Sequence, residues 1–169
     1  KAVTVEMKPS GKYYISVMVE CPNEIELKIN KKNNYNNLNV VGLDMSLSDF
    51  VVSSHEEDNT IVKYVRNYRK NEKRLSKLQR KLSRKEKGSK NRMKSKRQVA
   101  VLHEKIANQR KDFINKTALY FASKYDVIVL EDINLQNMSR TLRLGKSVTD
   151  LGFGEFRTIL EQKCKEYDT

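Results

Sequence analysis

The chain has 169 residues, with 34 Lys or Arg against 21 Asp or Glu, so its formal net charge is +13. This length suits one ordinary domain, or one domain with an appendage, and the positive charge favours a polyanionic partner such as nucleic acid or an acidic membrane face. No apolar run approaches the roughly 18 to 20 residues that a membrane span needs, and there is no signal-peptide pattern. We therefore expect a soluble, cytoplasmic protein without a membrane partner.

The first part of the chain predicts a β-hairpin, a linker and a three-stranded meander. Residues 1–20 contain two runs rich in Val, Ile and Tyr around the turn signal Pro-Ser-Gly. Residues 21–38 hold the polar run NKKNNYNN and show no periodicity, which is typical of a linker. Residues 39–66 read NVVGLDMS, DFVVSSH and TIVKYV, which predicts three short strands joined by turns.

Residues 67–125 predict a long helical hairpin. They contain no Pro, and their single Gly, Gly88, lies between two stretches with helical periodicity. The apolar positions are Leu75, Leu78 and Leu82 in the first arm and Val99, Leu102, Ile106, Phe113 and Tyr120 in the second. The break at Gly88 therefore indicates two antiparallel helices.

Residues 126–169 predict one more strand and a final helix. The run DVIVLEDI has the composition of a buried strand, and TDLGFGEFRTILEQKCKEY, from Thr149, has an apolar face of Phe153, Phe156, Leu160 and Cys164. The chain begins without Met and ends within this helical pattern, so we expect it to be a piece of a longer polypeptide. Cys21 and Cys164 have no close Cys or His neighbours, so we expect reduced thiols and no zinc site.

The positive charge is concentrated in the helical hairpin. Residues 63–111 hold 20 basic and 3 acidic residues, a net +17, so the remainder carries −4. A solvated helix normally mixes both signs, and this segment does not, so it predicts binding to the phosphate backbone of nucleic acid by charge and shape. A solvated basic coiled coil remains the alternative. The predicted contact residues are Arg69, Lys73, Arg74, Lys77, Arg80, Lys81, Arg84, Lys85, Lys90, Arg92, Lys94, Lys96 and Arg97.

Two predicted strands end in a carboxylate, VVGLD in Asp44 and VIVLE in Glu131. The long helical segment between them can act as a crossover that lets both strands run side by side in parallel. Their acids would then be neighbours, and two adjacent carboxylates commonly share a divalent cation. Oxygen ligands favour Mg²⁺ or Mn²⁺, and such a pair suits phosphodiester cleavage. Alternatively, Asp44 caps a turn and Glu131 is solvated.

The blocks VVGLDMSLSDF, NEKRLSKLQRKLSRKEKGSKNRMKSKRQVAVLHEKIANQRKDFINK, YDVIVLEDINLQNM and GFGEFRTILEQKCKEY, in this order, resemble the TnpB family. These are the insertion-sequence OrfB transposon proteins, related to type V CRISPR effectors. The resemblance implies an α/β fold of the ribonuclease H-like (RuvC) type, a mixed sheet with the basic helical hairpin inserted between strands three and four. It also implies that residues 1–20 end a preceding β-barrel domain.

The resemblance further implies that Asp44 and Glu131 are two of three catalytic carboxylates that bind Mg²⁺, and that the whole protein is a DNA endonuclease with a guide RNA. Family members continue into a zinc ribbon and a third catalytic Asp, which this sequence lacks, so we expect little or no cleavage by residues 1–169 alone. The alternatives are a nuclease-dead DNA- or RNA-binding regulator on the same scaffold and a basic helical-hairpin RNA-binding protein of another class.

Overall fold

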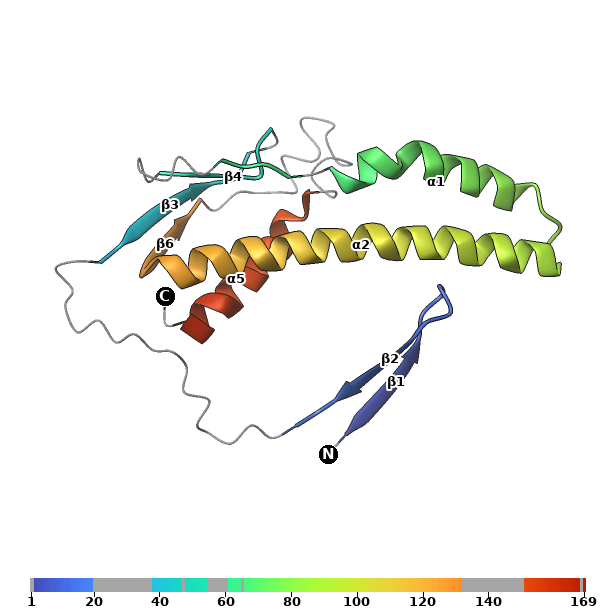
Figure 1. Ribbon diagram of the computed structural model, residues 1–169, viewed down its shortest axis with the longest axis horizontal. Helices are drawn as coiled ribbons and strands as arrows, with labels where there is room; N and C mark the ends of the chain where they lie inside the picture. The colour runs from blue at the N-terminus through green and yellow to red at the C-terminus, as the bar shows by residue number, and fades with distance from the viewer. Residues whose placement is uncertain are drawn as a thin grey trace. The chain divides into compact units, whose positions relative to one another are not determined.

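The computed structural model describes residues 2–19, 38–46, 48–54, 61–64, 66–131, 151–167 and 169 (Figure 1). The chain divides into two compact units. The first combines Lys1–Ile25 with Asn67–Gln109, and the second combines Glu26–Arg66 with Arg110–Thr169. The predicted linker, except for Leu38, lies outside the described residues, and so do residues 132–150.

The first unit begins with an antiparallel hairpin of β1 (Val3–Met7) and β2 (Tyr13–Val17). Gly11 in its turn has φ +82°, a left-handed conformation that glycine adopts without strain. The register pairs Val3 with Val17, Val5 with Ile15 and Met7 with Tyr13, so one face of the hairpin carries five aliphatic side chains and one tyrosine. These six side chains are 56–69% exposed. The assignment of this hairpin to a preceding β-barrel domain stays a prediction.

The first unit also contains the predicted helical hairpin, formed by α1 (Asn67–Ser83) and the first part of α2 (Lys90–Lys124). The two helices run antiparallel (Figure 1). Leu75 of α1 and Leu102 and Ile106 of α2 are buried against one another, with Tyr68, Leu78 and Val99 packed around them. Gly88, with φ +84°, lies in the connection, where the sequence places the break.

The second unit contains a mixed sheet with the order β5-β4-β3-β6. Its strands are β3 (Val40–Asp44), β4 (Val51–Ser53), β5 (Ile61–Val62) and β6 (Val127–Leu130). The first three form an antiparallel meander, and β6 pairs in parallel with β3. The parallel pairing predicted for the two acid-ending strands is therefore confirmed.

The core of the second unit lies between one face of this sheet, the second part of α2 and α5 (Phe153–Tyr167). Phe50 is fully buried, and its ring lies 5.1 Å from the ring of Phe156 and 5.5 Å from that of Phe153. Such ring pairs add to the free energy of apolar burial. The predicted apolar face of the last helix thus packs on the sheet, although Thr149, where we expected it to begin, is outside the described residues.

Among the helices in the described part of the chain, none is long and apolar enough to cross a membrane.

We predict that Phe156→Ala lowers the free energy of unfolding by about 3–5 kcal/mol, because it leaves a cavity among packed aromatic rings. Urea denaturation followed by circular dichroism measures the change. Gln162→Ala, at an exposed position of the same helix, is the matched control and should stay within about 0.5 kcal/mol of the parent chain. A loss below about 1 kcal/mol for Phe156→Ala would contradict the packing described here.

Candidate functional site

Asp44 and Glu131 are neighbours at one end of the β3–β6 pair. The register runs from Val40 opposite Val127 to Leu43 opposite Leu130, so the next residues, the two acids, also lie opposite each other. Side chains alternate along a strand, and Val41 and Leu43 are buried in the core. Both acids therefore lie on the other, open face of the sheet, where both are exposed.

Polar contacts at the start of the same strands set this register. The Asp126 amide donates to the Asn39 carbonyl at 2.9 Å, and the Asn39 amide donates to the Asp126 carboxylate at 2.8 Å. These two bonds align β3 with β6 one position before the ladder begins. A slip by one residue would move an acid to the core face, where an isolated charge is costly, so the register and the position of the acids depend on each other.

The two acids line a shallow pocket of about 510 Å³. Its other lining residues are Gly42, Leu43, Val52, Ser53, Ser54, Val129 and Leu130. The Ser54 hydroxyl accepts from the Gly42 amide at 2.8 Å, and the Ser54 amide donates to the Gly42 carbonyl at 2.9 Å. A Cβ at Gly42 would lie 3.1 Å from the Ser54 hydroxyl, so glycine leaves room for this contact. Gly42 and Ser54 are not among the residues that the sequence pattern indicates, because their relation depends on strand pairing.

The donor set at this pocket fits a hard divalent cation. It offers two carboxylates on one exposed face, and a cation between them would relieve their mutual repulsion. In the parts of the chain that the structure describes, no group of three or more His, Cys, Asp or Glu side chains comes together. Asp44 and Glu131 would supply two of the ligands if an ion bound here, and that they do so stays a prediction.

The thirteen predicted nucleic-acid contact residues all lie in the first unit, on α1, on α2 and in the connection between them. Eleven of them are exposed, and Lys85 and Arg92 are partly buried. Lys77, Arg80, Lys81, Arg84 and Lys85 alone line a pocket of about 340 Å³. This pocket consists of cationic side chains from the end of α1 and from the connection that follows it, so its electrostatic potential favours an anion.

Three of these basic residues are also held by the protein itself. The Arg92 guanidinium donates to the carbonyls of Leu82 and Lys85, both at 3.0 Å, and so satisfies backbone groups at the end of α1. Arg97 donates to the Ser10 carbonyl at 2.8 Å. Arg69 pairs with Glu72 at 3.4 Å. Their charges still add to the positive field, but part of their hydrogen-bonding capacity is used within the chain.

Glu104, one of the three acids in the basic segment, connects α2 to the β-hairpin. Its carboxylate accepts hydrogen bonds from the Tyr14 hydroxyl and, at 3.3 Å, from the Lys12 ammonium. The nearby Ser10 hydroxyl and then Tyr14 lower the pKa of the Glu104 carboxyl, while the hydrogen bond to Glu104 raises the pKa of Tyr14. Glu104 therefore links α2 to the β-hairpin through Tyr14 and Lys12, a contact that periodicity along the sequence does not indicate.

Two curated relatives are similar to this chain. One, from Streptomyces pristinaespiralis, is named “Putative RNA-guided DNA endonuclease” and is 36% identical over 127 residues, which is 75% of this chain and 31% of the relative. The other, from Escherichia coli (strain K12), is named “Putative RNA-guided DNA endonuclease InsQ” and is 33% identical over 178 residues, covering 96% of this chain and 42% of the relative. The chain thus spans less than half the length of either relative.

The sequence also matches a family across residues 14–142, which is more than half of the chain. This range includes both acids at the β3–β6 pair and all of the basic helical hairpin. The resemblance to the TnpB proteins is thereby confirmed. The chain belongs to the OrfB_IS605 family, which is described as “Probable transposase”.

Proposed function

We propose that this chain is part of an RNA-guided, metal-dependent DNA endonuclease of a mobile element, with Asp44 and Glu131 as two of its catalytic carboxylates. The observation that carries the proposal is the parallel β3–β6 pairing, which makes these two acids neighbours on the open face of the sheet. The mixed sheet with a helical crossover supports a ribonuclease H-like (RuvC) fold. The names of the two relatives support an RNA guide and a DNA target for the whole protein.

In this proposal Asp44 and Glu131 hold Mg²⁺ or Mn²⁺. A bound ion of this kind activates an attacking water and stabilises charge on the leaving oxygen of a phosphodiester. The Gly42–Ser54 hydrogen bonds hold β3 beside the end of β4, which fixes the backbone from which the Asp44 side chain extends. Because the family resemblance implies a third carboxylate, the two described acids by themselves are insufficient for efficient cleavage.

The basic helical hairpin is proposed to hold the nucleic acid by its phosphates. Its exposed cations outnumber the acids of the segment, and the end of α1 together with the connection that follows it presents a pocket lined only by basic residues. Each neutralised phosphate releases counterions, which makes the affinity strongly dependent on salt. Such contacts position a nucleic acid without reading its bases, so they suit a protein whose guide RNA supplies the sequence specificity.

We predict that Asp44→Asn and Glu131→Gln each reduce DNA cleavage by the whole guide-loaded protein by more than the ~100-fold typical of losing a group that only orients a metal ligand. Target binding, measured separately by gel shift, should persist because the basic surface is unchanged. Asp112→Asn, at an exposed acid of α2, is the control and should cleave at the parent rate. Parent-like cleavage by Asp44→Asn would remove Asp44 from the catalytic site.

The same measurements, repeated with and without Mn²⁺, separate the proposed nuclease from the alternative of a nuclease-dead regulator. A nuclease-dead regulator on this scaffold would bind DNA or RNA with a steep salt dependence, and neither its binding nor any other activity would respond to Mn²⁺ or to the Asp44 and Glu131 variants.

We predict that the double variant Lys77→Ala/Arg80→Ala reduces the slope of log affinity against log salt for a DNA duplex by up to about 2, because each lost phosphate contact removes ~0.9 from the slope. Fluorescence anisotropy at several salt concentrations measures it. Lys116→Ala/Lys165→Ala removes the same charge from exposed positions of the other unit and should leave the slope unchanged. Equal effects of both pairs would show that only net charge matters.

A further inference from the structure

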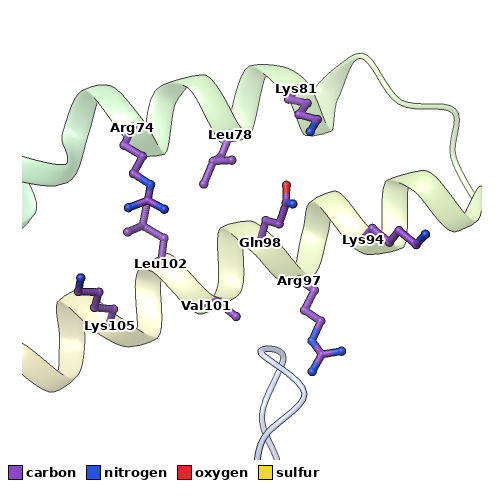
Figure 2. Close-up of a pocket in the computed structure, with 9 residues that line it drawn as sticks. All are labelled: Arg74, Leu78, Lys81, Lys94, Arg97, Gln98, Val101, Leu102 and Lys105. Carbon is purple, nitrogen blue, oxygen red and sulfur yellow. The ribbon is translucent and has the colours of Figure 1, made fainter.

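A groove with a volume of about 780 Å³ lies between α1 and α2 in the first unit, and we call it the α1–α2 groove (Figure 2). Its lining residues are Arg74, Leu78, Lys81, Lys94, Arg97, Gln98, Val101, Leu102 and Lys105. Five of these nine are cations, three are apolar and one is an amide. The groove therefore combines cationic with apolar side chains, and a surface that binds only phosphates does not require the apolar ones.

The apolar floor of the groove is small and partly open. Leu102 is 4% exposed and belongs to the packing between the helices, Leu78 is partly buried beside it, and Val101 is 44% exposed. Figure 2 shows Leu78 and Gln98 extending from facing helices toward each other. The floor thus offers a small apolar contact with one amide group next to it, which can both donate and accept hydrogen bonds.

The rim of the groove is cationic along both helices. Arg74 and Lys81 on α1 are about 10 Å apart along the helix axis, and Lys94 and Lys105 on α2 about 16 Å. These four side chains have no ion-pair partner among the residues that the structure describes. The fifth cation, Arg97, donates to the Ser10 carbonyl. A ligand that matches this groove has several anionic groups. Between them it has one group with an apolar face and with hydrogen-bonding atoms at its edge.

We propose that the α1–α2 groove binds one unpaired nucleotide of an RNA or DNA strand. Its base lies on the floor formed by Leu78, Val101 and Leu102, its edge faces Gln98, and the phosphates on either side contact the rim. The volume lies within the ~300–1,000 Å³ typical of small-ligand sites. A base in a continuous duplex cannot enter, because its faces are stacked on its neighbours. This inference rests on the proposed nucleic-acid binding of the helical hairpin.

The groove is a poorer match for an acidic amphipathic helix. Such a helix docks through apolar residues spaced over two or more turns and needs a correspondingly long apolar strip. Here two of the three apolar residues, Val101 and Leu102, are adjacent in sequence, and Met93, 67% exposed on the same helix, is not part of the lining. The short floor with its long cationic rim favours a single base with flanking phosphates.

The test uses the full 169-residue chain and a short duplex with one unpaired 2-aminopurine, made as RNA and as DNA, beside the same duplex fully paired. We expect the chain to bind the bulged duplex more tightly and to change the 2-aminopurine fluorescence. Val101→Ser should reduce this preference about 5-fold, the effect of losing one apolar contact with the base, and leave the affinity for the paired duplex unchanged. Comparing the RNA with the DNA probe identifies the strand type.

Met93→Ser is the matched control, because it makes a similar change at an exposed position of α2 outside the groove, and it should keep the preference. Thermal melting verifies that both variants fold. Salt-dependent binding of paired and bulged duplex with equal affinity would overturn the inference and leave the proposed function standing. Absence of binding to every probe would overturn both. The binding of an acidic amphipathic peptide is measured with the same variants. If Val101→Ser weakens the binding of this peptide but not that of the bulged duplex, the groove binds a protein partner instead.

Discussion

The parallel pairing of β3 with β6 is the constraint on which the candidate catalytic site depends. Parallel neighbours cannot be joined by a tight turn, so the chain between them must leave the sheet and return. Here that excursion contains the rest of the meander and both long helices. The reciprocal bonds between Asn39 and Asp126 fix where the two strands begin to pair. Asp44 and Glu131 each lie four residues after the first pair of the ladder, Val40 and Val127, so this alignment places the two carboxylates opposite each other.

The two faces of the same sheet have opposite requirements. Phe50, Phe153 and Phe156 form an aromatic cluster that binds α5 to the buried face, and the alternation of side chains then directs Asp44 and Glu131 outward. Burial of the apolar face therefore supplies the free energy that holds two like charges close together on the other. A cation at the acids would recover part of the electrostatic cost of their repulsion.

The first unit separates charge from packing in a similar way. A narrow seam of Leu75, Leu102 and Ile106 holds the two helices together, and the cations occupy the surface around it. Some of this charge has a structural role as well, since Arg92 satisfies carbonyls at the end of α1. The helical hairpin can therefore keep its fold while presenting an excess of positive charge to a phosphate backbone.

The sequence by itself determined the secondary structure elements and the concentration of charge in the helical hairpin, and it predicted that the two acid-ending strands can lie side by side. These follow from periodicity, turn residues and the rule that a long crossover permits parallel pairing, all of which are read along the chain. Only the tertiary structure decided that Ser54 bonds to Gly42, that Glu104 accepts from Tyr14 and that an apolar floor opens between α1 and α2. The physical reason is that these contacts join residues whose spacing in sequence carries no periodic signal, so they exist only once strands and helices have packed.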